Sequence, residues 1–167
     1  MKKWRRMVSS LLAAALLLTA VPTVWAAEED TGFSDVAADA WYAGAVEYVR
    51  DNGLMSGTGS ATFSPNAATS RAMLATVLYR AAGSPAAEGT AAFSDVAADA
   101  WYADAVAWAS ENGIVSGYGN GLFGTNDPVS REQIATILWR YEGSPSAESG
   151  QDFADESAIS GYASTAV

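Results

Sequence analysis

A ten-residue segment occurs twice in this chain without a single change. Residues 33–42 read FSDVAADAWY, and residues 93–102 repeat them. The period is 60 residues, and the two 60-residue windows that begin at Phe33 and Phe93 share 31 identical positions. A repeat of this length is typical of stacked supersecondary units, so we expect the chain to fold as an array of similar units.

The repeat divides most of the chain into copies and linkers. We predict one complete copy at 33–83, a second at 93–143, and the truncated start of a third at 153–167. The segments 84–92 and 144–152 each begin within a Gly-Ser-Pro motif and continue with small and polar residues. Such segments break helices and are interpreted as linkers.

The first 26 residues have the features of a secretory signal peptide. Four cationic side chains precede an apolar run at 11–18, and residues 24–26 (Val-Trp-Ala) fit a cleavage site. Polar residues and Pro22 flank this run and interrupt the stretch of about 20 apolar residues that a permanent membrane span needs. A short linker, 27–32, leads to the first copy, and we expect an exported protein.

Composition excludes several chemistries. The chain has no His and no Cys, so zinc sites built on these residues, Ser-His-Asp triads, Cys nucleophiles and disulfides are ruled out. Beyond residue 26 there are five Arg, no Lys and 19 acidic residues, a net charge of −14 that should repel nucleic acid and anionic membranes. The glycine-rich segments lack a phosphate-loop lysine, and no carboxylates have calcium-loop spacing. We therefore predict no cofactor and no metal site.

Apolar periodicity predicts two helices in each copy and hence a mostly α fold of tandem helix-loop-helix repeats. The first helix is expected to have Asp39 or Asp99 as its N-cap and to end before Gly53 or Gly113. A turn with at most one short strand should follow it.

The second helix of each copy is expected to begin directly after Ser70 or Ser130. Ser130 and Gln133 have the spacing of a capping box, in which each side chain satisfies a free backbone N–H of the other residue. Copy one has Met73 in place of the glutamine. The capping pattern alone therefore predicts that the second helix of copy one frays more readily.

Arg71 and Arg131 occupy the first position of these helices, where the helix dipole disfavours a cation by about 0.3–1 kcal/mol. Helix stability does not explain an arginine there. Unpaired N–H groups at a helix start attract anions, and a guanidinium beside them binds a carboxylate or phosphate through two hydrogen bonds. The pattern predicts an anion pocket in each copy, but ion pairs with Asp95 or Asp155 of the next copy explain it equally well.

The Trp-Tyr pairs that open the first helix of each copy have two possible roles. Trp41 and Trp101 could offer flat faces to a sugar ring. Large aromatic residues at helical spacing more often anchor a core, and the sequence alone favours that role.

Four other charged residues are expected to support the structure. Asp35 and Asp95 should accept backbone hydrogen bonds that order the turn before the first helix, and they are assigned as groove-lining or structural. Arg80 and Arg140 lie near helix C-termini, where a cation complements the dipole. No binding function is predicted for either arginine.

Taken together, these motifs resemble the S-layer homology family. The resemblance is carried by Phe-Ser-Asp-Val, Trp-Tyr, Ala-Val, the mid-repeat glycine, the Phe-Ser-Pro-Asn at 63–66, and Ser-Arg before the second helix. It covers nearly all of 33–83 and 93–143, and the 15 residues of the third copy. The family's Thr-Arg-Ala-Glu hallmark appears as Ser-Arg-Ala-Met at 70–73 and Ser-Arg-Glu-Gln at 130–133, so the acid is missing from both copies.

This resemblance implies a module that anchors exported bacterial proteins non-covalently to the cell wall or S-layer. Its implied fold is a pseudo-threefold bundle of three copies, which would be incomplete here. Its implied ligand is a peptidoglycan-linked secondary polysaccharide that often bears pyruvate ketals, whose carboxylate is the kind of anion described above. The site residues implied for the carboxylate are Arg71, Arg131, Ser70 and Ser130, and those implied for the sugar groove are Trp41 and Trp101. No catalytic residue is predicted.

Two alternatives remain open at this point. The copies could assemble with other protein chains, with the arginines in inter-chain ion pairs, and the truncated third copy should then promote self-association through exposed apolar faces. The chain could also be a wall-acting enzyme that uses paired carboxylates such as Asp95 and Glu132. The second alternative is disfavoured because the repeats account for the whole chain after the signal peptide.

Overall fold

The computed structural model describes residues 31–90, 92–146 and 153–167. The expected signal peptide, most of the linker 27–32 and residues 147–152 of the second linker lie outside the described residues. In the described part the chain forms α1 (Ala43–Asp51), α2 (Arg71–Ala81), α3 (Ala103–Glu111), α4 (Arg131–Tyr141) and the short 3-10 helix η1 (Glu156–Ala158). These ranges contain no strand, only two isolated bridges. The predicted mostly helical fold is confirmed, and none of the described helices is long and apolar enough to cross a bilayer.

The second helix of each copy begins where the sequence predicts. Ser70 is the N-cap of α2 and accepts a hydrogen bond from the Met73 N–H at 3.3 Å. Ser130 does the same for Gln133 in α4, and its own N–H donates to Gln133 Oε1 at 3.2 Å. The expected capping box is therefore present in copy two.

The first helix of each copy begins later than predicted. Asp39 and Asp99 are not its N-caps, since α1 starts at Ala43 with Tyr42 as an N-cap that makes no side-chain hydrogen bond, and α3 starts in the same way. The preceding residues form tight turns instead, one of them closed by the Ala43 N–H donating to Ala40 at 2.8 Å. These turns occupy the positions that the sequence pattern assigns to a first helical turn.

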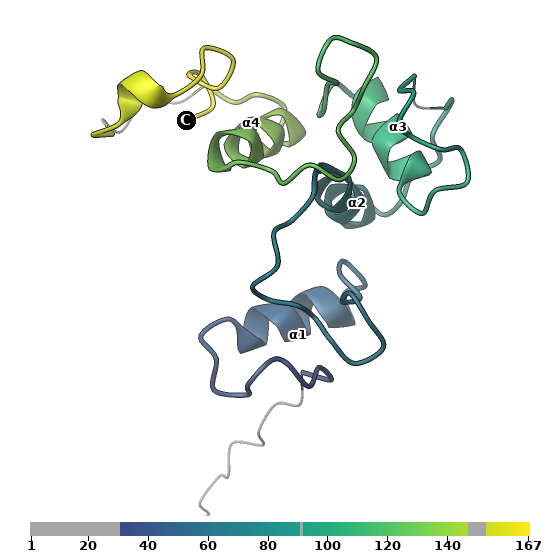
Figure 1. Cartoon of the computed structure of the whole chain (residues 1–167), viewed down its shortest axis with the longest axis vertical. Helices are drawn as coiled ribbons and strands as arrows, with labels where there is room; N and C mark the ends of the chain where they lie inside the picture. The colour runs from purple at the N-terminus through teal and green to yellow at the C-terminus, as the bar shows by residue number, and fades with distance from the viewer. Residues whose placement is uncertain (1–30, 91, 147–152) are drawn as a thin grey trace, which may run out of the picture.

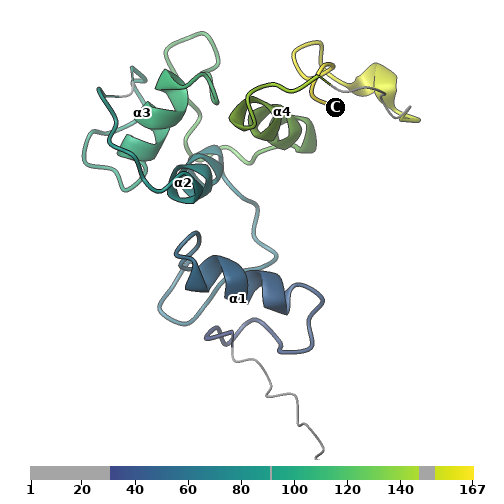
Figure 2. The same ribbon diagram turned by 180° about the vertical axis from the view of Figure 1, so that it is seen from behind.

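The helices of one copy do not pack as a unit. The closely packed pair is α2 with α3, which come from different copies. Figures 1 and 2 show α2 directly beside α3, with α4 on the other side of α2 and α1 standing apart with its own loop. The tandem repeats are therefore not self-contained, because the second helix of copy one completes the core of copy two.

Two cores follow from this arrangement. The larger one is buried between α2, α3 and the loop after α3, with one residue from α4: Ala72, Ala75, Leu78, Val106, Trp108, Ala109, Ile114, Val115, Phe123 and Ile137. The smaller one holds α1 against its own turn: Phe33, Val36, Ala43 and Val46. The larger of the two cores thus lies at the junction between copies.

Backbone hydrogen bonds tie the start of α2 to copy two. The N–H groups of Arg71 and Ala72 donate to the carbonyls of Asp127 and Thr125 at 3.0 and 3.2 Å. Two of the N–H groups that a helix start normally leaves unpaired are therefore satisfied by another copy. These bonds favour the opposite order of stability to the one that the capping box alone predicts.

Hydrogen exchange tests that order. We expect the amides of Arg71 and Ala72 to exchange about tenfold more slowly than those of Arg131 and Glu132, which make no such contact within the described residues. The measurement is residue-resolved exchange under native conditions. Faster exchange at the start of α2 than at the start of α4 would contradict the role of the inter-copy bonds.

Candidate functional site

Arg71 joins the two copies through its side chain. Arg71 is only 6% exposed, although it is the first residue of α2. The guanidinium donates from Nε to the Phe123 carbonyl at 2.9 Å and from Nη2 to the Ser116 carbonyl at 2.8 Å. Its Cζ also lies 4.8 Å from the ring centres of both Tyr118 and Phe123. The loop after α3 is therefore folded around a cation that copy one supplies.

The ion pairs considered from the sequence are not found in the described residues. Arg71 has no carboxylate within 4 Å there and uses backbone carbonyls and aromatic rings instead. Arg131, its counterpart in copy two, is exposed and likewise has no ion pair in this part of the chain. The two arginines thus share a sequence position but not an environment.

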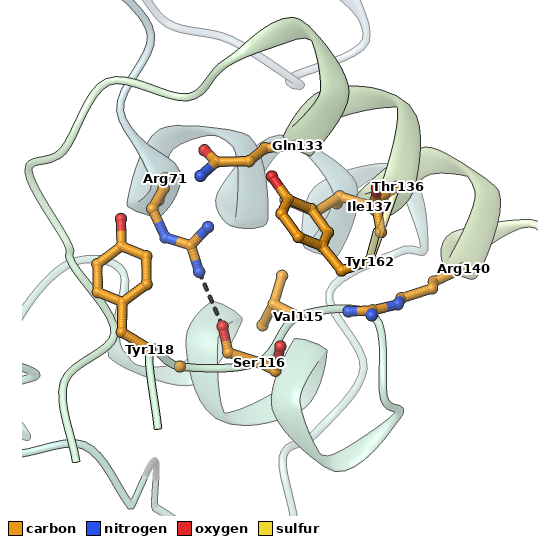
Figure 3. A pocket seen from close by; sticks show the side chains of 10 residues that line it. Arg71, Val115, Ser116, Tyr118, Gln133, Thr136, Ile137, Arg140 and Tyr162 are labelled. Atoms are coloured by element: carbon orange, nitrogen blue, oxygen red, sulfur yellow. Dashed lines mark hydrogen bonds between the residues drawn. The ribbon is translucent and has the colours of Figure 1, made fainter. Parts of the chain in front are cut away.

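A cavity of about 230 Å³, here called cavity A, lies where α2, the loop after α3, α4 and the C-terminal segment meet. Figure 3 shows the Arg71 guanidinium on one wall, the Gln133 amide directed toward it, and Tyr162 on the facing side. The lining residues are Arg71, Val115, Ser116, Gly117, Tyr118, Gln133, Thr136, Ile137, Arg140 and Tyr162. Cavity A therefore contains residues from all three copies.

A second cavity of about 470 Å³, cavity B, lies one repeat earlier in the array. It is lined by Leu54, Met55, Ser56, Gly57, Thr58, Phe63, Met73, Thr76, Val77, Arg80 and Trp101. Adding 60 to the numbers of most of these residues gives those of cavity A. The array thus repeats one kind of cavity between the loop of a copy, the second helix of that copy and the start of the next copy.

Three arginines line these cavities, two of which the sequence analysis treated as purely structural. Arg140 lines cavity A and Arg80 lines cavity B. Arg80 also donates from Nη1 to the Leu54 carbonyl at 3.1 Å, so it fixes the loop and faces the cavity at once. The missed signal is their position: each lies on the same helical face as residues three and four places earlier that line the same cavity.

Asp35 and Asp95 shape the loops that line the cavities. Asp95 accepts hydrogen bonds from the N–H groups of Phe123, Gly124 and Thr125 at 2.8, 2.8 and 3.3 Å. Burial acts to raise the pKa of Asp95, but these three N–H groups outweigh it and leave the pKa below its usual value. The Asp95 carboxylate thus ties together segments about 28 residues apart, and does not order only the turn before α3.

Asp35 makes the equivalent contacts in copy one. Its carboxylate accepts from the N–H of Phe63 at 2.8 Å and of Ser64 at 2.7 Å. The Phe63 contact is the main cause that lowers the pKa of Asp35.

Glu132 is a further organising residue that the sequence analysis considered only as a catalytic candidate. Its carboxylate accepts hydrogen bonds from Ser160 N and Oγ at 2.9 and 3.0 Å and from the Tyr162 hydroxyl at 2.7 Å. The contact with Ser160 N–H is the main cause that lowers the pKa of Glu132. Glu132 therefore holds the C-terminal segment on α4 and places Tyr162 at cavity A.

Trp41 and Trp101 are not core residues, contrary to the role that the sequence alone favours for them. Trp41 is 94% exposed and Trp101 is 63% exposed. Their neighbours Tyr42 and Tyr102 pack against the cores instead, and each tryptophan meets its tyrosine edge-on. Trp101 borders cavity B, whereas Trp41 lines neither cavity.

A matched pair of substitutions tests the structural role of Arg71. We expect Arg71→Ala to lower the free energy of unfolding by about 2–3 kcal/mol, because the carbonyl of the fully buried Phe123 loses its donor. Arg131→Ala should change it by less than about 0.5 kcal/mol, since that side chain is exposed. Urea unfolding followed by circular dichroism gives both values. Equal losses of unfolding free energy in the two variants would rule out a stabilising role for the contacts of Arg71 with copy two.

Acid should destabilise the array through its hydrogen-bonded carboxylates. A carboxyl whose pKa is lowered by folding stabilises the fold at pH values above its unfolded pKa, here 3.8 for Asp and 4.5 for Glu. That stabilisation is lost as the pH falls through the lowered pKa. We expect a flat thermal midpoint from pH 7 to about pH 5, with a fall below about pH 4.

Asp95→Asn should weaken this acid dependence, and Asp99→Asn, from the same segment, is the charge-matched control. Thermal unfolding between pH 3 and pH 7 provides the comparison. If the thermal midpoint of Asp95→Asn fell with decreasing pH as steeply as that of the unchanged protein, Asp95 would not be a source of the acid dependence.

Comparisons with known proteins identify the family of the two complete copies. The S-layer homology domain model matches residues 32–73 and 92–135. The surface-layer 125 kDa protein of Lysinibacillus sphaericus is 34% identical over 164 residues, which are 96% of this chain and 13% of that protein. The middle cell wall protein of Brevibacillus brevis is 32% identical over 143 residues, 83% of this chain and 14% of that protein.

A segment of this kind also occurs in a protein named as an enzyme. An endoglucanase of Bacillus sp. (strain KSM-635) is 32% identical over 140 residues, 81% of this chain and 15% of that protein. The chain thus spans 13–15% of the length of these three relatives.

The expected location at the cell surface is confirmed by the surface-layer and cell-wall relatives. The family model covers about half of the chain and falls on both complete copies. The chain belongs to the S-layer homology domain family.

Proposed function

We propose that the chain anchors an exported bacterial protein non-covalently to the cell wall. In this proposal the ligand is a peptidoglycan-linked secondary polysaccharide whose pyruvate ketals carry carboxylates. The observation that carries the proposal is cavity A, which combines Arg71 and Arg140 with a hydrogen-bonding amide at a junction of copies.

The distribution of charge supports an anionic ligand. Beyond residue 26 the chain carries 19 acidic residues and only five arginines, so a general attraction to polyanions is excluded. Three of those five arginines, Arg71, Arg80 and Arg140, line the cavities. A fourth, Arg50, pairs with Glu47 and Asp51 on α1. Cationic side chains are therefore concentrated where a ligand would bind.

Each residue implied by the family resemblance has a place in the proposal. Arg71 and Arg131 bind glycan carboxylates, and Ser70 and Ser130 present the helix starts beside them. The exposed ring of Trp101 packs against a sugar face at cavity B, and Trp41 offers the same exposed surface in copy one. A pseudo-threefold closure of three copies would bring further cavities of this kind together.

The hydrogen bonds that Asp95 and Glu132 accept favour binding over catalysis as the function of the chain. Asp95 accepts three backbone hydrogen bonds, and Glu132 accepts three from Ser160 and Tyr162. A general acid for glycoside hydrolysis needs a raised pKa, but the pKa of each of these groups lies below its usual value. Neither is poised to protonate a leaving group.

Self-association is the second candidate function. It is favoured by large exposed side chains away from the cavities, above all Trp41 at 94% and Tyr48 at 62% exposure. In that case wall binding would not depend on the pyruvate ketal, and the apparent mass would rise with protein concentration.

The decisive experiment is sedimentation of residues 27–167 with purified wall sacculi. We expect binding to intact sacculi and its loss after acid treatment that strips the secondary polymer, or after removal of the ketal carboxylate. Equal binding before and after stripping would refute the proposal and favour protein assembly.

Arginine variants then test the site. The double variant Arg71→Ala, Arg131→Ala should lower wall affinity at least about tenfold, which corresponds to the loss of one charge-assisted contact. Arg71→Lys keeps the charge, Arg50→Ala is the control outside the cavities, and thermal unfolding of each variant separates lost binding from lost structure. Retained affinity in a folded double variant would exclude the assigned role.

A further inference from the structure

The two cavities occupy equivalent places in the repeat but differ in their chemistry. Position 73 is Met in cavity B, and its counterpart in cavity A is Gln133. Trp101 borders cavity B, whereas Tyr162 borders cavity A. Arg71 lines cavity A in addition to Arg140, whereas in the described part of the chain Arg80 is the only charged residue that lines cavity B.

Cavity A is built to donate hydrogen bonds to a negatively charged group. Gln133 Oε1 already accepts from the Ser130 N–H, so its Nε2 is the group left to donate into the cavity. Figure 3 shows this amide directed toward the Arg71 guanidinium. A carboxylate between them would meet donors from two helices, α2 and α4.

Cavity B has an apolar wall instead. Met55, Phe63, Met73 and Val77 line it together with the exposed Trp101. Its one charged group, Arg80, is partly engaged by the Leu54 carbonyl. Its volume is about 470 Å³, twice the 230 Å³ of cavity A. Such a wall suits the C–H face of an uncharged sugar ring, with polar groups at the rim.

We infer that the two cavities bind different sugar residues of one polysaccharide. Cavity A takes the carboxylate-bearing residue, and cavity B takes an uncharged pyranose of the same polymer, with the side chains at positions 73 and 133 deciding which residue each prefers. The inference rests on the proposed wall-polymer function. A repeated receptor on a repeating polymer also gains affinity, because the second contact is intramolecular once the first has formed.

The sequence supplies a separate reporter for each cavity. Of the four methionines, only Met55 and Met73 remain in residues 27–167, and both line cavity B. Their carbon-13 methyl signals therefore report on cavity B alone. The δ1 methyl of Ile137 reports on cavity A.

The test is a titration of residues 27–167 with a methyl pyranoside and with its 4,6-pyruvate ketal, followed by solubilised wall polymer. We expect the uncharged sugar to shift the methionine methyls and the ketal to shift Ile137, each with at least about tenfold preference. Met73→Gln should abolish the apolar preference of cavity B, and Gln133→Met should weaken ketal binding at cavity A. Because α2 already has Met at this helix position, Gln133→Met should fold.

The outcomes separate this inference from the proposed function. If wall polymer binds but both reporters respond equally to both sugars, or only Ile137 responds to any of them, the division is refuted while anchoring stands. If neither reporter responds to wall polymer, both proposals are overturned. Unchanged preferences in the two variants would refute the role of positions 73 and 133.

Discussion

The inter-copy contact of Arg71 is the interaction on which the rest of the array depends. A buried guanidinium needs hydrogen-bond acceptors, and here the loop of the following copy supplies them through Phe123 and Ser116. The same loop then lines cavity A. Removing the cation would therefore disturb the fold and the candidate site together, which is why the two roles of Arg71 have to be separated by measuring stability beside binding.

Interlocking between copies also explains where the cavities lie. Because α2 packs on α3, the second helix of one copy and the first helix of the next form one unit. Each cavity opens at the edge of such a unit, where a loop, a helix and the start of the next copy meet. A single copy of the sequence would lack at least one of these walls.

The sequence predicts the local features better than the tertiary ones. Periodicity and capping residues locate the starts of α2 and α4, because Ser70 and Ser130 act on N–H groups three residues away. The partners of Arg71 and Glu132 could not be predicted, since they lie 28 to 52 residues along the chain. The exposure of Trp101 was also missed, because periodicity does not reveal that the neighbouring tyrosine is the one that packs inward.

Internal comparison of the copies separates scaffold from specificity. The Asp at 35 and 95, which binds loop N–H groups, and the Ser-Arg that opens the second helix are the same in both copies. Cavity positions 55, 58 and 73 carry Met, Thr and Met, but their counterparts 60 residues later are Val, Tyr and Gln. Within this set, a change at Arg71 or Asp95 leaves backbone groups of the buried Phe123 without their hydrogen-bond partners. Cavity side chains face open space, so they are free to diverge, and in a duplicated array this divergence is the simplest route to two binding sites of different chemistry.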